Sequence, residues 1–317
     1  MKVLVTGGAG FIGSHLCEKL LNEGHKVTAY DNLLLGRREF LSQCERSENF
    51  QFLQEDLLNL DILVSVMKGH DLVFHMAANS DISQGAKQTD VDLKNGTFAT
   101  YNVLEAMRLN QVKNLVFASS SAIYGEADVM PTPENYGPLM PISLYGASKL
   151  ACEALCTAFA HNFNINIWMY RFANIVGSHS THGVIYDFVD KLKKDSKSLH
   201  VLGDGSQRKS YLHVSDCVDG MLYGYKNLKN ECEVLNLASR GVTNVKFIAE
   251  EVVRQMAARS GNKAELHYGE GQRGWRGDVP YTHLEGAKFE KLGWSAKMTS
   301  DEAVVLAVQE IISEKMG

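Results

Sequence analysis

A tyrosine and a lysine four residues apart are the side chains of this sequence best suited to chemistry. Tyr145 and Lys149 lie in the run Ser143-Leu-Tyr-Gly-Ala-Ser-Lys149, and this spacing places two side chains on one face of a helix. A phenol loses its proton near pH ~10, but positive charge nearby favours the phenolate, which can then take a proton from an alcohol. The same spacing also describes an ordinary amphipathic pair, so the interpretation as a base depends on the elements around it.

A strand, a glycine turn and a helix at the N-terminus supply that setting. Residues 2–6 are typical of a short buried strand and run into Gly7-Gly-Ala-Gly10-Phe-Ile-Gly13, which opens an amphipathic helix. Gly7 permits the tight turn, Gly10 lets the backbone approach a pyrophosphate, and Gly13 lets the helix pack on the strand. The N-H groups at the start of the helix then face the phosphates. The pattern predicts a dinucleotide site.

The second strand indicates which dinucleotide is bound. Residues 26–30 form a further strand pattern that ends on Asp31, whose carboxylate is placed to accept a hydrogen bond from a ribose 2′-hydroxyl and to repel a 2′-phosphate. NAD is therefore favoured over NADP. Arg37 and Arg38 follow in the same loop and keep NADP open, because an arginine there can bind a 2′-phosphate; otherwise they are surface charges.

Composition fits an enzyme of this kind. The 317 residues are 45% hydrophobic and 22% charged, enough for one large and one smaller domain. A net charge of -5 argues against a nucleic-acid partner, and no continuous apolar span reaches membrane length. The first residues contain no signal region, and the six cysteines include no Cys-x-x-Cys pair. We expect a cytoplasmic protein with reduced thiols.

Strand and helix patterns alternate along the first half of the chain, which predicts an α/β fold. Strands are expected at 49–53, 72–76, 113–118 and 165–170, and helices at 61–67 and 90–109. We interpret residues 1–171 as a Rossmann-type domain with a doubly wound parallel sheet, to which later segments return. Residues 172–317, with helices near 184–194, 215–226 and 245–259, are interpreted as mainly a smaller C-terminal α/β substrate-binding domain.

Polar clusters follow three successive strands of the predicted sheet. They are Asp56-Leu57, Ala77-Ala-Asn79-Ser80 and Ser119-Ser-Ser121. Ligands of such sheets bind beyond the carboxyl ends of the strands. Each cluster alone is also ordinary turn chemistry.

The order of these motifs resembles a known family. The runs that carry the resemblance are Thr6-Gly-Gly-Ala-Gly-Phe-Ile-Gly13, Asp31-Asn32, His75-Met-Ala-Ala78, Ser119-Ser-Ser-Ala-Ile-Tyr-Gly125, Tyr145-Gly-Ala-Ser-Lys149 and Arg171-Phe-Ala-Asn-Ile-Val-Gly177. They resemble the extended short-chain dehydrogenase/reductases over essentially the whole chain. Within that superfamily the sequence looks most like the NAD-dependent nucleotide-sugar epimerase/dehydratase group, and in particular the UDP-glucose 4-epimerases.

The resemblance implies a role for each matching residue. Tyr145 would accept the proton, Lys149 would hold the nicotinamide ribose and lower the tyrosine pKa, and Ser120 would bond to the reacting sugar oxygen, with Ser119 and Ser121 as alternatives. The implied cofactor-binding residues are Gly7, Gly10, Phe11, Ile12, Gly13, Asp31, Asn32, Asp56, Leu57, Met76, Ala77, Ala78, Tyr145 and Lys149.

Substrate contacts are also implied. Ser80 would face the sugar and Asn174 the diphosphate. The diphosphate needs cations, which residues 203–209 and 272–278 offer. Arg208 and Arg276 are the chosen residues, and the nearest alternatives are Lys209 and Arg273; each arginine taken alone is more often a solvated loop residue.

The reaction type depends on the two residues after Ser120. Hexose dehydratases that resemble this chain carry Asp-Glu there, whereas this sequence has Ser121 and Ala122. Without those carboxyls we expect NAD-dependent C4 epimerisation of a nucleotide sugar, a UDP-hexose by resemblance, through a transient 4-keto sugar. The alternatives are a dehydratase with an unusual proton shuttle and, less favoured, a non-catalytic NAD-binding regulator.

Two further interpretations concern metals and oligomers. His179 and His182 lack a nearby carboxylate or cysteine set in the sequence, so no metal is assigned. The helix at 90–109 and the Tyr145 helix can pack against a second subunit, although packing on the chain's own sheet explains their apolar stripes equally well. The expected homodimer follows mainly from the resemblance.

Overall fold

The computed structural model describes residues 1–228, 231–274 and 277–316. They form two compact units, neither of which is a single stretch of chain. Unit 1 consists of Met1–Gly125, Glu134–Phe172 and Val218–Asn236. Unit 2 consists of Glu126–Pro133, Ala173–Cys217 and Leu237–Gly317.

A seven-stranded sheet forms the centre of unit 1, in the order β11-β6-β5-β4-β1-β2-β3. The six strands from β6 to β3 pair in parallel. The chain starts at an inner strand and extends to both sides, which confirms the predicted doubly wound α/β fold. The strands are β1 Lys2–Thr6, β2 Lys26–Asp31, β3 Phe50–Gln54, β4 Leu72–His75, β5 Asn114–Ser120, β6 Asn166–Phe172 and β11 Cys232–Leu237.

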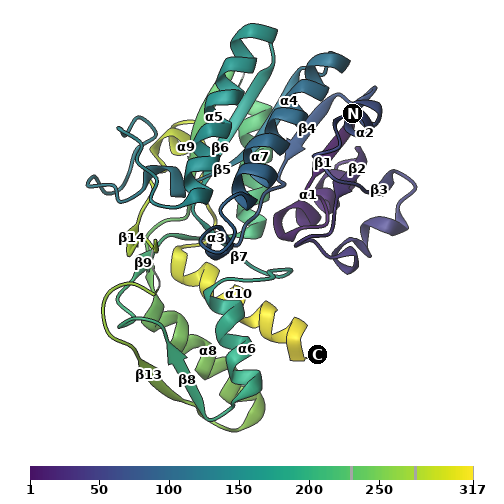
Figure 1. Cartoon of the computed structure of the whole chain (residues 1–317). Helices are drawn as coiled ribbons and strands as arrows, with labels where there is room; N and C mark the ends of the chain where they lie inside the picture. The colour runs from purple at the N-terminus through teal and green to yellow at the C-terminus, as the bar shows by residue number, and fades with distance from the viewer. Residues whose placement is uncertain (229–230, 275–276, 317) are drawn as a thin grey trace. The chain divides into compact units, whose positions relative to one another are not determined.

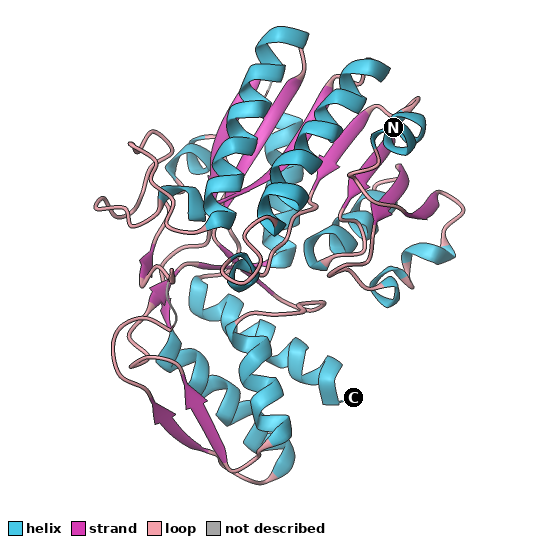
Figure 2. Ribbon diagram, viewed as in Figure 1, coloured by secondary structure: helices cyan, strands magenta, loops and turns pink. Residues whose placement is uncertain are grey.

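Helices cover both faces of this sheet (Figures 1 and 2). Adjacent residues of a strand point to opposite faces, and β4 shows the result. Val73 packs in the cluster that contains α4 and α5 residues, whereas the Phe74 ring lies 6.4 Å from the Tyr225 ring of α7. The helices are α1 Phe11–Asn22, α2 Leu60–Met67, α3 Ile82–Gly85, α4 Ala99–Asn110, α5 Leu144–Phe163 and α7 Val214–Asn227, which begins in unit 2.

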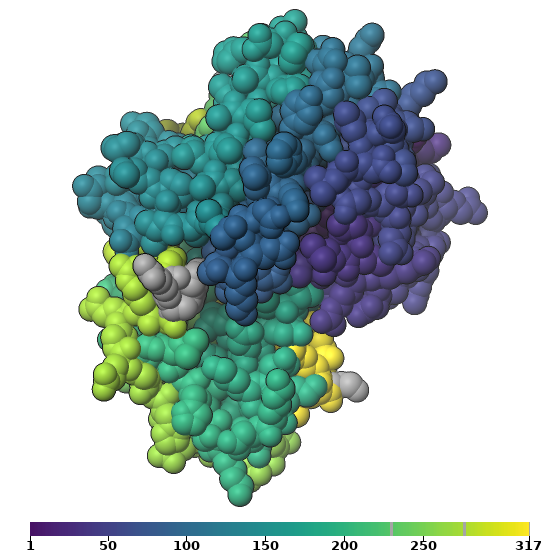
Figure 3. All heavy atoms as spheres, in the orientation of Figure 1, coloured from purple at the N-terminus to yellow at the C-terminus, as the bar shows by residue number. Residues whose placement is uncertain are grey.

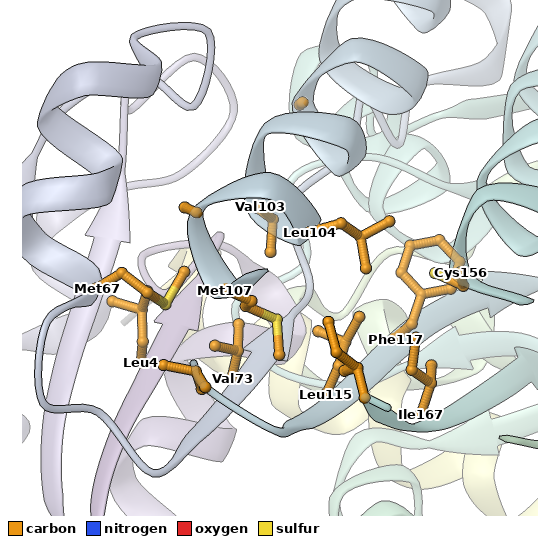
Figure 4. Close-up of a cluster of buried hydrophobic side chains, with 14 of the residues drawn as sticks. Leu4, Met67, Val73, Val103, Leu104, Met107, Leu115, Phe117, Cys156 and Ile167 are labelled. Carbon is orange, nitrogen blue, oxygen red and sulfur yellow. The ribbon is translucent and has the colours of Figure 1, made fainter. Parts of the chain in front are cut away.

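The core of unit 1 lies between the sheet and the helices α2, α4 and α5. In Figure 4, Val103 and Met107 of α4 point toward Leu4 and Val73 of the sheet. All four side chains are fully buried, and burial of each such side chain contributes about 1.5–3 kcal/mol. This packing fixes the helices that present the candidate site.

The helix predicted at 90–109 is divided in the structure. Residues Leu93–Phe98 form a π-helical segment, η3, and only then does α4 begin. A Cβ at Gly96 would lie 2.2 Å from the Ser148 hydroxyl of α5. The Ser148 hydroxyl donates to the backbone oxygen of Asp92 at 2.7 Å and bonds to the Thr97 hydroxyl at 3.0 Å. The wider turn therefore coincides with close contact to α5, which local sequence pattern does not reveal.

Unit 2 combines short strands with a three-helix core. The helices α6 Val184–Lys194, α8 Val245–Ser260 and α10 Ser300–Met316 pack on one another around one hydrophobic cluster. The remaining elements are β7 Asn174–Val176 beside β10 Tyr211–His213, β8 Ser198–Val201 beside β13 Glu265–Tyr268, the group β9 Arg208–Lys209, β12 Thr243–Asn244 and β14 Tyr281–Thr282, and α9 Ala287–Lys291. Among the described residues, no helix is both long and apolar enough to cross a membrane.

Candidate active site

The helix α5 carries both Tyr145 and Lys149. It begins after Ser143, whose hydroxyl accepts a hydrogen bond from the backbone N-H of Gly146 at 3.1 Å and so caps the helix. Lys149 Nζ lies 5.8 Å from the centre of the Tyr145 ring. It donates to the backbone oxygen of Ala118, on β5, at 2.5 Å. The lysine thus holds the start of α5 against the central sheet beside the tyrosine.

Burial dominates the electrostatics of this pair. Lys149 is 4% exposed; burial lowers its pKa, while Cys152 and Asp92 are among the groups that act in the opposite direction. Tyr145 is partly buried; loss of hydration raises the pKa of its hydroxyl to about 12, and a hydrogen bond with Ser120 partly offsets this. The phenol is therefore protonated near neutral pH, and it needs added positive charge before it can serve as a base.

Ser120 lies at the carboxyl end of β5 and bonds to Tyr145. Its hydroxyl oxygen accepts a hydrogen bond from the backbone N-H of Ala122 at 3.1 Å, which fixes the side chain at the start of the 3-10 segment η4, Ser121–Tyr124. The neighbouring Ser119 hydroxyl instead donates to Glu153 at 2.5 Å. The structure therefore favours Ser120 over Ser119 as the serine beside the tyrosine.

The glycine turn after β1 forms a close-fitting cradle at the start of α1. Gly7 has φ +68°, and a Cβ there would lie 2.7 Å from the backbone nitrogen of Ala77. At Gly13 a Cβ would lie 2.0 Å from the Gly7 oxygen. Gly10 precedes the first helical residue, Phe11, without a side-chain cap, so the first backbone N-H groups remain available for an anion. These features fit a dinucleotide pyrophosphate.

The carboxylate predicted to bind the ribose is held firmly at the end of β2. Asp31 is 8% exposed, and its two oxygens accept hydrogen bonds from the backbone N-H groups of Ala9 at 3.0 Å and Leu33 at 2.8 Å. Burial raises the pKa of Asp31, and these two hydrogen bonds counter the effect. A carboxylate has about four acceptor positions, so Asp31 retains the capacity to bind ribose hydroxyls.

The two arginines after Asp31 lie beside carboxylates. Arg37 is 3.8 Å from Glu39, and Arg38 is 2.9 Å from Glu45. This pairing matches the interpretation of both arginines as surface charges and favours NAD over a 2′-phosphorylated cofactor.

The loops after β2, β3 and β4 meet at the same edge of the sheet as the glycine turn. Asn32 donates to the Asp56 carboxylate at 3.0 Å. Leu57 is buried, and its backbone oxygen accepts from Asn102 at 2.8 Å. The Met76 backbone N-H donates to the end of β1 at 3.1 Å. The residues predicted to line the dinucleotide therefore lie around one edge.

The residues predicted to contact the substrate are less concentrated. Ser80 is exposed in the loop after β4 of unit 1. Asn174 begins β7 in unit 2, and its side-chain amide donates to the Ser210 oxygen at 3.4 Å.

The candidate cations differ in their surroundings. Arg208 is exposed and lies 5.5 Å from a tyrosine ring. Lys209 pairs with the Asp278 carboxylate at 2.6 Å, and Arg273 donates to the backbone oxygen of Asp278 at 2.7 Å. Arg276 lies outside the described residues. Among the described residues, Lys209 and Arg273 thus have carboxylate or backbone partners at hydrogen-bond distance, and the choice of Arg208 stays a prediction.

Comparison with known proteins places this geometry in a family. A family model described as "NAD dependent epimerase/dehydratase family" matches residues 3–238. The chain belongs to this family. An uncharacterized UDP-glucose epimerase of Bacillus subtilis (strain 168) is 34% identical over 279 residues, 84% of this chain and 85% of that protein.

Solved structures of family members agree over the full length. A crystal structure of a UDP-galactose 4-epimerase has a TM-score of 0.88 and 39% sequence identity, covering 99% of both chains. A UDP-glucose 4-epimerase of Thermotoga maritima, solved with UDP-glucose, has a TM-score of 0.88 and 29% identity, covering 100% of both chains.

A buried ion pair joins β6 to α5 and was not predicted from the sequence. Arg171 binds both Glu153 oxygens, at 3.0 and 2.8 Å, and the two side chains are 6% and 7% exposed. Arg171 also donates to the Tyr124 hydroxyl, which donates to Asn236, each at 2.8 Å. The sequence did contain a signal for this pair, because Arg171 follows the apolar residues of a predicted buried strand. A buried arginine requires an anionic partner.

A second missed feature is a neutral histidine beneath Lys149. His75 is fully buried. Its ring nitrogens lie 2.6 Å from the Thr6 hydroxyl and 3.0 Å from the Thr100 hydroxyl. Burial, and then the charge of Lys149, lower the His75 pKa to about 3. His75 therefore links β1, β4 and α4 without adding a charge. Within the described ranges, no three His, Cys, Asp or Glu side chains cluster as metal ligands.

Proposed function

We propose that this protein epimerises a nucleotide sugar, a UDP-hexose, at C4, with a tightly bound NAD. The convergence of Tyr145, Lys149 and Ser120 carries the proposal, because these groups suit removal and return of an alcohol proton. The next two positions, Ser121 and Ala122 in η4, provide no carboxyl. Reversible oxidation at C4 therefore fits this site better than elimination of water.

The chain's own residues handle the proton of the sugar. Tyr145 takes the proton of the C4 hydroxyl and returns it after the sugar has turned over, while Ser120 holds the reacting oxygen. Lys149 binds the nicotinamide ribose. Bound NAD would supply reversible hydride transfer at C4 of the sugar.

We infer that the binding residues fall into two groups, one for the dinucleotide and one for the nucleotide sugar. The loops after β1 to β4 hold the dinucleotide, through the glycine turn, Asp31 and residues 56–57 and 76–78. Ser80 faces the sugar, and Asn174, Arg208 and Arg276 hold the diphosphate, whose charge suits arginine.

Product analysis tests this function. The purified protein is incubated separately with UDP-glucose, UDP-N-acetylglucosamine and UDP-glucuronate, and products are resolved by NMR and mass spectrometry. Unchanged mass with inverted C4 is expected for at least one substrate, and loss of water would instead identify a dehydratase.

A matched pair of variants tests the base. Tyr145→Phe is expected to lower kcat by about 10²- to 10⁴-fold, the usual contribution of acid-base catalysis, with NAD still bound. Tyr101→Phe, on the exposed surface of α4, is the control. Full turnover in Tyr145→Phe would remove this residue from its role.

We further propose that the protein is a homodimer through α4 and α5. Large apolar side chains are exposed at the start and along the outer side of α4, at Phe98 (52%), Tyr101 (42%) and Leu109 (50%), and at Phe163 (38%) at the end of α5. In Figure 3, α4 and α5 form an uncovered face at the top of the view. Apolar surface of this kind favours a partner.

We also place the protein in the cytoplasm. All six cysteines are unpaired thiols, the state that a reducing compartment maintains.

A further inference from the structure

A buried carboxyl lies beside the Tyr145 and Lys149 pair, and the mechanism above gives it no task. Asp92 immediately precedes the π-helical segment η3 and is 2% exposed. One of its carboxyl oxygens, Oδ1, accepts a hydrogen bond from Asn79 at 3.0 Å. The other, Oδ2, has no hydrogen-bond partner in the part of the chain that the structure describes. Buried carboxyls are normally paired, so an unpartnered oxygen calls for an explanation.

The backbone around Asp92 fixes this carboxyl against the start of α5. The Ser148 hydroxyl, next to Lys149, donates to the Asp92 backbone oxygen at 2.7 Å. A Cβ at Gly85 would lie 2.5 Å from Asp92 Oδ2 and 3.5 Å from the Leu144 Cβ, which adjoins Tyr145. Asp92 is therefore held between the end of α3 and the first turns of α5.

Asp92 and the Tyr145 and Lys149 pair influence one another's pKa. Burial is the largest influence on Asp92 and raises its pKa; Asp81 acts in the same direction, whereas Asn79 and Lys149 lower it. In turn, the Asp92 charge raises the pKa of Tyr145, and after Cys152, Cys156 and Glu153 it is the fourth group that raises the pKa of Lys149.

The other titratable groups that face the pair are two cysteines, one glutamate and His75, which is neutral and whose pKa the Lys149 charge lowers. Cys152 acts on both Tyr145 and Lys149, and Cys156 and Glu153 act on Lys149. Glu153 is already paired with Arg171 at 2.8 Å, which leaves Asp92 as a carboxyl near the pair without a cationic partner of its own at hydrogen-bond distance in the described ranges.

We propose that Asp92 is a positioning residue of the reaction, whose buried carboxylate helps to keep Lys149 protonated and shifts the pH range in which Tyr145 exchanges a proton with the sugar. The need for it follows from the burial of Lys149, because a desolvated ammonium loses its proton readily unless an anion lies nearby. The same negative charge disfavours the phenolate form of Tyr145. Asp92 therefore stabilises the charged form of Lys149 and, at the same time, makes Tyr145 harder to deprotonate. This inference rests on the proposed epimerase function.

The decisive variant is Asp92→Asn, which keeps an oxygen to accept from Asn79 and removes the charge. Without that charge both the Tyr145 and the Lys149 pKa fall. Both limbs of the pH profile of kcat/KM for UDP-glucose, measured on the NAD-loaded enzyme, should move to lower pH by about one unit. Asp90→Asn is the matched control. Asp90 lies two residues before Asp92, and its exposed carboxylate is paired with Lys94. This substitution removes the same charge and should leave both limbs of the pH profile in place.

A second readout does not depend on turnover. The ring-carbon NMR signal of Tyr145, assigned by its absence in Tyr145→Phe, is followed against pH in NAD-loaded protein and should titrate about one unit lower in Asp92→Asn. A shifted NMR titration without epimerisation would support the role of Asp92 and reject the function. Epimerisation with an unmoved titration would reject the role of Asp92 alone.

A purely structural role predicts a different result. In that case Asp92→Asn lowers the melting temperature or the maximum of kcat/KM, and both limbs of the pH profile stay at the wild-type pH. This result would overturn the proposal. If Asp92→Asn does not fold, Asp92→Ser, which is smaller and also neutral, is held to the same two readouts.

Discussion

At the scale of single residues, the sequence identified the groups whose chemistry is local. Tyr145 and Lys149 share a helix face because of their spacing, whereas Ser120 was assigned through the resemblance to the family, with Ser119 and Ser121 as alternatives. Glu153, Arg171 and Asp92 were missed as participants because their partners are set by tertiary packing. The pKa of Tyr145, about 12, was also beyond reach, because it depends mainly on burial.

The buried histidine yields a prediction about stability and pH. His75 has a pKa of about 3 in the folded protein against 6.5 for an ordinary histidine, so between these values the unfolded chain binds one proton more. Stability contributed by neutral His75 is therefore present above about pH 6.5 and is lost as pH falls, by about 1.4 kcal/mol per pH unit.

Urea unfolding at several pH values between about 4 and 6 measures this effect. The free energy of unfolding of the wild type should fall more steeply toward acid than that of His75→Gln, in which the titrating ring is absent. His161→Gln, at an exposed position of α5, controls for the substitution itself. Equal slopes for wild type and His75→Gln would contradict the prediction.

At the scale of elements, buried strands and amphipathic helices were predicted to within a few residues. The main error was the helix expected at 90–109, whose first part is the π-helical η3. Its wide turn coincides with contacts to Ser148, about 50 residues later in the chain, and a periodicity argument sees only near neighbours. The helix α10 was not predicted at all.

The glycine turn at the start of α1 gives an element-scale prediction. In Gly13→Ala the new methyl group would meet the Gly7 oxygen at 2.0 Å, so the helix must shift away from the strand and the phosphate cradle must open. A loss of at least about tenfold in NAD affinity is expected, since overpacking costs about 1–3 kcal/mol.

Isothermal titration of NAD into the cofactor-stripped variants measures that loss. Gly286→Ala is the control, because Gly286 immediately precedes α9, has φ -96°, and has open space within 4 Å of the point where the new methyl group would lie. Unchanged NAD affinity in Gly13→Ala would show that the turn tolerates a side chain.

At the scale of the whole molecule, the proposed dimer predicts a change in mass. Phe98→Glu combined with Tyr101→Glu places two charges on the exposed apolar surface of α4, where a partner would have to desolvate them. Sedimentation should give twice the 35.1 kDa chain mass for the wild type and a single chain mass for the double variant. Leu202→Glu, at another exposed apolar side chain (60%), should not change the wild-type result, and a wild type that sediments as one chain would refute the dimer.

The division of the chain into two units could be predicted only in part from the sequence. Alternating strands and helices predict a doubly wound sheet, but they do not say where the chain leaves it. Residues 126–133 belong to unit 2 although their neighbours on both sides belong to unit 1. Prolines are frequent there, with Pro131, Pro133, Pro138 and Pro141 close together, but they indicate a loop and not the unit to which it belongs. Whether a loop packs on unit 1 or on unit 2 depends on its tertiary contacts, which local sequence does not indicate.

The edge strand β11 has a consequence for how the protein is made. It reaches the sheet beside β6 only after the ribosome has synthesised much of unit 2, since residues 218–236 complete unit 1. A nascent chain halted near residue 172 would therefore expose one side of β6 and lack the helix that covers Phe74. Unit 1 can therefore complete its fold only after residues 218–236 have been synthesised. A truncated protein that ends near residue 172 should be insoluble rather than fold as an independent N-terminal domain.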